Sequence, residues 1–269
     1  MLYDYHIHTK YCRHATGEVQ EYVEQALKMS LDEMGFSDHY PMFLYPPSLT
    51  PEEYAMTLSE MPRYFSGIKR MQALYRDRIT IKTGIEFDYV QGKETVLREE
   101  IAKNSFDYVF GSVHLLYDWV IDHPSNAYRY KEVDIDQFYI AYFNALKELV
   151  KSRLFDIVAH IDVVKRFGYK PASGYSQLLA EALDLIAENS VVLEINTSGV
   201  DAPAGETYPS HEVFKELYKR DIQILLGSDA HAPSQVGRHF EKTLEQLKNA
   251  GYTQLVTFEK RKRGFANIE

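Results

Sequence analysis

The sequence predicts an α/β fold built around a parallel sheet, and two observations carry this prediction. Short apolar runs alternate with amphipathic segments along the chain, which is the pattern of repeated βα units. Within the short runs, apolar residues follow one another almost without interruption, as in a sheet covered on both faces. The length of 269 residues fits one βα barrel, and we expect a single domain over residues 1–269 because no linker divides the chain.

Seven runs are predicted as strands. They are residues 2–6, 33–37, 79–87, 107–111, 155–159, 191–196 and 222–227. The segments between them carry apolar residues at spacings of three and four, which predicts helices with one buried face. The clearest of these helices are residues 18–29, 136–151, 176–188 and 210–220. We expect a closing helix at residues 240–250 and one further strand at residues 255–258.

Residues 41–77 form a connection that is longer than a simple crossover between two strands. Prolines punctuate it at Pro41, Pro46, Pro47, Pro51 and Pro62. We therefore expect a loop with one or two helices that lies over the mouth of the barrel.

Composition excludes several classes of protein. The net charge of −9 argues against nucleic-acid binding, which needs a basic surface. The basic run at residues 260–263 is therefore predicted to be a solvated tail near the C-terminus. No apolar run is long enough to span a membrane. The single Cys12 excludes an internal disulfide framework and fits a reducing cytoplasm, so we expect a cytoplasmic protein.

Side chains that bind metals stand at the ends of six of the seven predicted strands. They are His6 and His8, His39, Glu86, His114, His160, and Asp229 with His231. In a βα barrel these strand ends converge on one face, where active sites lie. A lone histidine is more often a hydrogen-bonded core residue, but six strand ends in chain order indicate a metal site.

The kinds of ligand indicate which metals the site would hold. His-x-His and Asp-x-His each place two side chains on one face of an extended backbone, where they can chelate one ion. Imidazoles mixed with carboxylates suit zinc, manganese or iron. The histidines are too many for one ion, and Glu86 could bridge two ions. Such a multinuclear site activates a water and clamps a transferring phosphoryl group.

These residues together resemble the signature of the PHP (polymerase and histidinol phosphatase) superfamily. The stretches at residues 11–15 and 194–199 resemble more narrowly its histidinol-phosphate phosphatase branch. The resemblance covers essentially the whole chain. It implies a distorted (β/α)7 TIM-like barrel with three divalent metal ions at the C-terminal ends of the strands.

The resemblance also implies a ligand for each ion. His6 and His8 would hold the first ion with Glu86 and Asp229, and Glu86 would bridge to a second ion on His114 and His160. The third ion would be held by His14, His39 and His231. Of the remaining histidines, His123 and His239 are predicted to be surface residues. His211 follows the loop at Asn196 and is a candidate pocket residue.

Candidate substrate contacts follow from position and residue type. Arg166, just past the fifth strand, could grip a phosphate bidentately or form a surface salt bridge, and the resemblance favours the phosphate. Arg238 and Ser198 are further candidates. Relatives often carry a basic residue where this chain has Asp201. The second basic contact to phosphate is therefore absent here or is made by another residue.

The resemblance implies a phosphomonoesterase that hydrolyses L-histidinol phosphate in histidine biosynthesis. A metal-bridging hydroxide would attack phosphorus, with Asp229, Glu86 and Arg166 as the catalytic residues and Asp229 handling the proton. Two alternatives remain open: a phosphodiesterase or exonuclease acting on nucleotides, and a metal-stabilised scaffold without activity.

Overall fold

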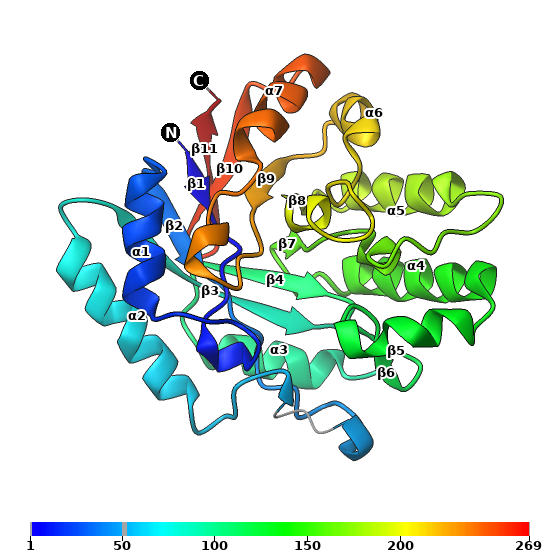
Figure 1. Cartoon of the computed structure of the whole chain (residues 1–269), viewed down its shortest axis with the longest axis horizontal. Helices are drawn as coiled ribbons and strands as arrows, with labels where there is room; N and C mark the ends of the chain where they lie inside the picture. Colours follow the sequence, from blue (N-terminus) through cyan, green and yellow to red (C-terminus); the bar gives the residue numbers. More distant parts are fainter. Residues whose placement is uncertain (1, 50–52, 269) are drawn as a thin grey trace.

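Seven parallel strands, arranged in the order of the chain, form the central sheet of the protein (Figure 1). The computed structural model describes residues 2–49 and 53–268. The strands are β1 (Tyr3–Asp4), β2 (Glu33–Phe36), β3 (Thr80–Asp88), β4 (Tyr108–Ser112), β7 (Ile157–Val158), β8 (Val192–Asn196) and β9 (Ile224–Gly227). Each of the seven overlaps one of the predicted strands in sequence, so the seven-strand prediction is confirmed.

The sheet curls until its two edges meet just beyond β1 and β9. There Ile7 pairs with Ala230 in a parallel bridge. His8 N donates a hydrogen bond to Ala230 O at 2.9 Å, and Ala230 N donates one to His6 O at 3.2 Å. The result is a nearly closed, distorted barrel with seven strands, as expected.

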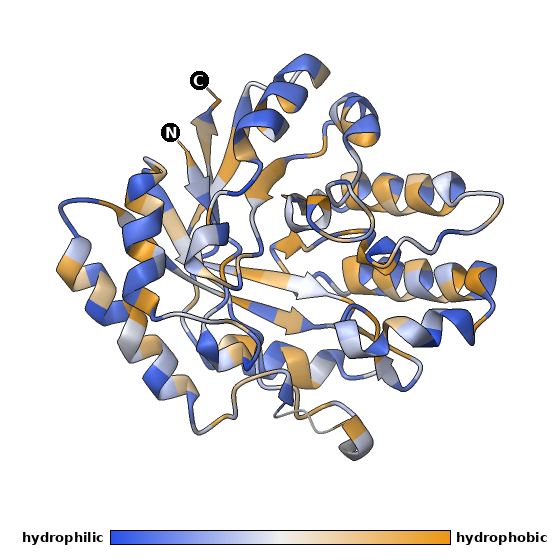
Figure 2. Cartoon of the chain, viewed as in Figure 1, coloured by the Kyte–Doolittle hydropathy of each residue, from blue (hydrophilic) through white to orange (hydrophobic). Residues whose placement is uncertain are grey.

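Helices cover the outside of this barrel. They are α1 (Val19–Lys28), α2 (Met61–Tyr75), α3 (Glu94–Ala102), α4 (Ile135–Ser152), α5 (Ser176–Glu188), α6 (Phe214–Lys219) and α7 (Phe240–Ala250). Short 3-10 helices join the elements: η1 (Lys10–Cys12), η2 (Pro47–Leu49), η4 (Pro124–Lys131), η5 (Val163–Lys165), η6 (Ser198–Val200), η7 (His211–Val213) and η8 (Pro233–Gln235). Figure 2 shows hydrophobic residues along the strands and mixed stripes on the helices, as amphipathic helices on a buried sheet require.

Helix α4 illustrates how the sequence specifies one of these helices. The Asp134 side chain caps its first turn by accepting a hydrogen bond from Gln137 N. Phe138, Tyr142 and Leu146 recur at a spacing of four and are all buried. That spacing places them on one face of the helix, which packs against the barrel.

Aromatic rings fill the N-terminal half of the barrel. Tyr5 stacks on Tyr108 with ring centroids 4.7 Å apart, and Tyr108 Oη donates a hydrogen bond to Tyr5 O at 2.7 Å. A Cβ atom at Gly35 or Gly84 would overlap the Tyr108 ring. Glycine at these two positions therefore lets the large ring occupy the barrel axis.

The C-terminal segment corrects one prediction. Residues 260–263 are exposed, as expected, but they are not a tail: residues 260–261 form the turn of a hairpin between β10 (Gln254–Glu259) and β11 (Lys262–Asn267), and residues 262–263 begin β11. Arg261 Nε donates to Asp156 Oδ2 at 2.8 Å, and Phe258 N donates to Tyr5 Oη at 3.2 Å. The predicted strand at residues 255–258 thus exists, but it lies outside the seven-stranded sheet.

The connection at residues 41–77 also differs in part from its prediction. Helix α2 lies beside α1 (Figure 1) and packs on β3 as a crossover helix, not over the mouth: Tyr64 Oη donates to Gly84 O at 3.2 Å. Residues 50–52 of this connection lie outside the described residues. A small hairpin of β5 (Leu115–Leu116) and β6 (Trp119–Val120) follows β4 and was not expected. In the described part of the chain, no helix combines the length and apolar character that crossing a membrane requires.

Candidate metal centre

The strand ends bring the predicted ligand side chains together in the mouth of the barrel. His6 and His8 follow β1, and their Nε2 atoms lie 3.0 Å apart. His114 follows β4 and His160 follows β7, and their Nε2 atoms lie 3.1 Å apart. All four rings are buried. Ring nitrogens this close repel each other through their lone pairs unless a proton or a metal ion lies between them.

Glu86, near the end of β3, faces both of these pairs. Its Oε1 lies 3.0 Å from His160 Nε2 and 3.6 Å from His114 Nε2. Its Oε2 lies 3.5 Å from His6 Nε2 and 3.5 Å from His8 Nε2. One carboxylate that presents an oxygen to each pair has the arrangement of a bridging ligand.

Asp229 enters the mouth from a strained backbone. Its φ of 50° lies in the left-handed region, which is uncommon for a residue other than glycine. Asp229 Oδ1 lies 3.4 Å from His8 Nε2, while Oδ2 accepts hydrogen bonds from Ser198 Oγ at 3.2 Å and Asn196 Nδ2 at 3.4 Å. One oxygen is therefore held by the protein and the other faces the histidines.

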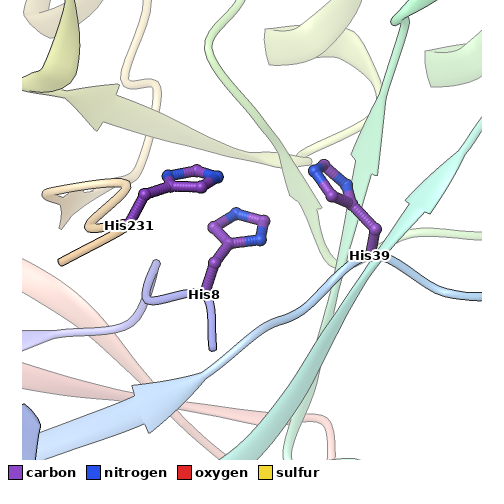
Figure 3. A group of neighbouring side chains, drawn as sticks. All are labelled: His8, His39 and His231. Carbon is purple, nitrogen blue, oxygen red and sulfur yellow. The ribbon is translucent and has the colours of Figure 1, made fainter. Parts of the chain in front are cut away.

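Three more histidines gather on the other side of His8. Figure 3 shows His8, His39 and His231 approaching one another from three separate segments, and one ring nitrogen of each lies within 4.8 Å of the others. The His14 ring centroid lies 4.6 Å from that of His231. The predicted third ligand group, His14, His39 and His231, is thus brought together, with His8 as an additional neighbour.

A layer of buried carboxylates behind the histidines was not anticipated. Glu194 Oε1 lies 2.6 Å from His6 Nδ1, and its Oε2 accepts a hydrogen bond from His160 N at 2.8 Å. Asp88 Oδ1 lies 2.8 Å from His114 Nδ1. A Cβ atom at Gly227 would overlap Glu194 Oε1, so this glycine leaves room for the contact. These carboxylates fix ring orientation and direct Nε2 of each histidine into the mouth.

The sequence held a usable signal for Glu194. It precedes Asn196 by two residues on β8, so both side chains lie on the same face of that strand. The position inside the strand, and not at its end, is the reason that a search of strand ends passed over it.

Electrostatics couple the charged groups strongly. Burial alone lowers the pKa of His6, but Glu194, Asp229 and Glu86 together raise it well above its ordinary value. Burial raises the pKa of Glu86, yet His39, His6 and His114 hold it well below the usual range. Glu86 is therefore ionised and draws positive charge towards the mouth.

Two other histidines are shifted in the opposite direction. Burial lowers the pKa of His8 well below its ordinary value, and His231 and His39 lower it further. Burial, together with His231 and His39, lowers the pKa of His14 to about 3. Both rings are therefore neutral at physiological pH, which is the form that binds a metal ion.

The donor set fits divalent metal ions. His231 Nε2 is buried and forms no hydrogen bond with the described residues, and Glu86 Oε2 is approached by His39 Nδ1 at 3.0 Å. Buried polar atoms without partners are rare and indicate an absent ligand. Imidazole nitrogens with two carboxylates suit zinc, manganese or iron.

A cavity of about 270 Å³ opens above this cluster. Arg166, Arg238 and Ser198 line it, as predicted. Burial alone lowers the pKa of Arg166, but Asp122, Tyr208 and Asp229 raise it above the usual value, so this guanidinium stays charged. Arg238 is fixed by hydrogen bonds to Ser228 O at 2.9 Å and Asp229 O at 3.0 Å.

His211, a candidate pocket residue in the sequence, does not line the cavity. It lies exposed at the start of η7, and it is absent from the described residues that line the cavity. The chain turns away after the Asn196 loop, so a residue later in that loop does not reach the mouth. His123 is half-buried against Tyr54, and His239 Nε2 lies 2.7 Å from Asp201 Oδ1.

The cavity also contains two carboxylates that were not predicted as ligands. Asp201, half exposed, lies at its rim, and Asp122 follows the β5–β6 hairpin. Asp122 stands in an insertion after β4, where neither periodicity nor a strand end marks it in the sequence.

A model of the PHP domain matches residues 4–198 of the chain. The protein belongs to the PHP family. Asp229 and His231 lie beyond the matched residues, but similarity to whole relatives extends over them.

Relatives of this PHP protein are similar over almost their full length. A Deinococcus radiodurans protein named "probable histidinol-phosphatase" is 34% identical, with 97% of this chain and 98% of the relative covered. The histidinol-phosphatase of Bacillus subtilis is 29% identical, with 90% of this chain and 98% of that protein covered.

A solved structure is similar in fold as well. Histidinol phosphate phosphatase from Lactococcus lactis, in complex with zinc, L-histidinol and phosphate, matches with a TM-score of 0.83 and 25% sequence identity. The match covers 98% of both chains. Strand order and barrel shape are therefore shared along the whole length.

Proposed function

We propose that this PHP protein is a metal-dependent phosphomonoesterase that hydrolyses L-histidinol phosphate to L-histidinol and inorganic phosphate. One observation supports this most strongly. The barrel mouth joins a histidine–carboxylate cluster to a small cavity lined by two arginines. Full-length similarity to histidinol-phosphatases supports the choice of substrate.

The proposal includes three divalent ions, zinc, manganese or iron, held by nine residues. The proposed ligands are His6, His8, His14, His39, Glu86, His114, His160, Asp229 and His231. When bound, such ions supply a nucleophilic water at neutral pH and positive charge for the phosphoryl oxygens.

The arginines would bind the phosphate. Arg166 remains charged and lines the cavity, so its planar guanidinium can donate two hydrogen bonds to phosphate oxygens. Arg238 is held by backbone carbonyl groups and by Asp201 Oδ2 at 3.2 Å, which fixes its charge at the rim. Arg238 would thereby replace the basic residue expected at the Asp201 position.

Asp229 would accept the proton lost by the attacking water. Its Oδ1 faces the histidines while Ser198 and Asn196 hold Oδ2, so the accepting oxygen is oriented before substrate binds. The water oxygen forms the new bond to phosphorus as the ester bond to the alcohol breaks, and the departing alkoxide oxygen takes up the proton held by Asp229. Fixed dipoles and charges of this kind supply most of the barrier reduction in phosphoryl transfer.

The test is phosphate release from L-histidinol phosphate by protein reconstituted with manganese or with zinc. Sugar phosphates, nucleotides and a phosphodiester are measured beside it. We expect L-histidinol phosphate to lead in kcat/KM by at least about a hundredfold, which corresponds to about 2.7 kcal/mol. A lead by the diester or a nucleotide would contradict the substrate assignment, and no turnover by metal-loaded protein would contradict catalysis.

A conservative variant tests the role of Asp229. Asp229→Asn keeps the shape of the side chain but cannot accept the proton. We expect it to lose at least about a hundredfold in kcat. Full activity of Asp229→Asn with its metal content intact would exclude this role.

A further inference from the structure

The two carboxylates that line the cavity outside the proposed ligand set differ in their surroundings. Asp201 is half exposed and already paired, with Arg238 Nη1 at 3.2 Å and His239 Nε2 at 2.7 Å. The Asp122 side chain accepts no hydrogen bond from the described part of the chain. A quarter of its surface remains exposed. Asp122 is therefore a carboxylate open to a ligand, whereas Asp201 is not.

Asp122 lines the cavity next to a proposed metal ligand. Its Oδ2 lies 3.9 Å from His114 Nε2. Arg166 lines the same cavity, and a carboxylate with a quarter of its surface exposed is ionised at neutral pH. The wall beside the proposed phosphate site therefore carries a fixed negative charge.

A negative charge at this place weakens the binding of any ligand that is only a phosphate, because like charges repel across a partly buried cavity. The arrangement becomes favourable when the ligand also brings a positive charge next to its phosphate. Aminoalkyl phosphates have that property.

We propose that Asp122 binds the ammonium group of the substrate and selects aminoalkyl phosphate esters over other phosphate monoesters. This inference rests on the proposed function. In L-histidinol phosphate only two carbons separate the ammonium nitrogen from the ester oxygen. The partner of the ammonium must therefore lie beside the metal cluster, where Asp122 is, and not at the rim, where Asp201 is.

The same charge favours departure of the product phosphate. Once the ester is cleaved, inorganic phosphate no longer carries an ammonium, so the repulsion from Asp122 is uncompensated. The alcohol keeps its ammonium and its attraction to Asp122. Weak inhibition by inorganic phosphate is thus a second consequence of the same residue.

The experiment compares wild type and Asp122→Asn on two esters. One is L-histidinol phosphate, and the other is 3-(imidazol-4-yl)propyl phosphate, which lacks only the amino group. We expect Asp122→Asn to lower kcat/KM for L-histidinol phosphate by about ten- to a hundredfold, as for the loss of a hydrogen bond between charged groups. Activity on the desamino ester should stay within about threefold of wild type, and inorganic phosphate should inhibit more strongly.

Controls separate this role from folding and from metal binding. Asp118→Asn changes an exposed carboxylate of the same hairpin and should leave both esters unaffected. Asp122→Ser provides a second variant if Asp122→Asn does not fold. Metal content per chain, measured by elemental analysis, should be unchanged in both Asp122 variants.

The outcomes are distinct. An equal loss on both esters, or a loss of metal from the Asp122 variants, would overturn the inference and leave the proposed function intact. Failure of the wild-type protein to hydrolyse L-histidinol phosphate would overturn the proposed function and this inference with it.

Discussion

The two halves of the barrel are built from the same strands but satisfy their polar groups in opposite ways. In the N-terminal half, Tyr108 Oη donates to Tyr5 O, and the glycines of β2 and β3 make room for its ring. In the C-terminal half, His231 Nε2 is buried without a partner among the described residues, and the Nε2 atoms of His6 and His8 face each other at 3.0 Å. The polar groups of the first half are satisfied within the protein, whereas the second half leaves polar atoms facing one another that a bound ion would satisfy.

The difference shows that one barrel can keep the residues that stabilise the fold at one end of its axis and the candidate reactive residues at the other end. Tyr5 and His6 are neighbours in sequence, yet Tyr5 belongs to the packed half and His6 to the half with the proposed metal ligands. Close packing without partner-free polar atoms stabilises the fold. Clustered, ionised groups destabilise the metal-free mouth, which bound ions would then stabilise.

Glu86→Gln should produce the largest effect and should be confined to the reactive half. The amide cannot bridge two ions as a carboxylate does, so we expect kcat/KM to fall at least about a thousandfold. Steady-state kinetics and metal content per chain measure the effect. Glu259→Gln, an exposed change in the hairpin, is the control. A Glu86→Gln protein with full metal content and near-normal activity would contradict the bridging assignment.

Tyr108→Ala should produce the complementary effect in the packed half. Removing a fully buried ring leaves a cavity between β2, β3 and β4, so we expect a loss of about 3–5 kcal/mol in the free energy of unfolding. The folded fraction should retain its metals. Urea denaturation measures the stability, and Tyr108→Phe, which keeps the ring, should lose only about 1–2 kcal/mol. A loss of bound metal from folded Tyr108→Ala would show that the two halves are not separate.

The metal-free mouth should respond to pH. Because nearby carboxylates raise the pKa of His6, this ring carries a proton at neutral pH until an ion displaces it. Metal binding should therefore release a proton, and apparent affinity should rise about tenfold per pH unit.

Calorimetric titration with zinc in two buffers of different protonation enthalpy measures this proton release. His239→Gln, which lies outside the cluster, should release the same number of protons. In the metal-free protein the raised pKa adds stability below the ordinary histidine pKa, and this stability is lost as pH rises through the folded value. Zinc binding without proton release near pH 6 would contradict the assignment.

The smallest effect concerns an ion pair between the loop that carries His14 and the start of helix α2. Glu60 accepts a hydrogen bond from Arg13, beside His14, and another from Thr57 N, which lower the pKa of Glu60 to about 2. Its contribution to stability is present above the ordinary carboxyl pKa and is lost as pH falls towards 2. Because Glu60 is a quarter exposed, Glu60→Gln should cost less than about 1 kcal/mol.

Thermal melting at pH 7 and at pH 3.5 measures this contribution. The difference between wild type and Glu60→Gln should shrink at the lower pH. A difference in melting temperature that grows as pH falls would show that ionised Glu60 does not stabilise the folded protein.

The sequence predicted the candidate site residues that stand at the ends of strands. His6, Glu86, His160 and Asp229 each follow or terminate an apolar run, and parallel strands end on the same side of a barrel. Position along one strand therefore predicted proximity in space, and the predicted ligand side chains do lie together.

Residues outside that rule were missed or misplaced. Asp122 stands in an insertion whose path no periodicity specifies, and Glu194 lies within a strand and acts through His6. His211 was expected near the cavity because of a nearby loop, but the direction of a loop depends on tertiary contacts. The basic run at residues 260–263 was interpreted from charge alone, although a pairing partner for the 255–258 strand follows it directly.

The closure of the barrel between β1 and β9 depends on synthesis of nearly the whole chain. Ser228 N donates to Asp4 Oδ1 across 224 positions of sequence, and the proposed ligands begin at His6 and end at His231. A nascent chain that has emerged only as far as β8 holds most of the histidines but lacks Asp229. The full set of proposed ligands exists only once β9 lies against β1, so metal capture by these residues would follow completion of the barrel.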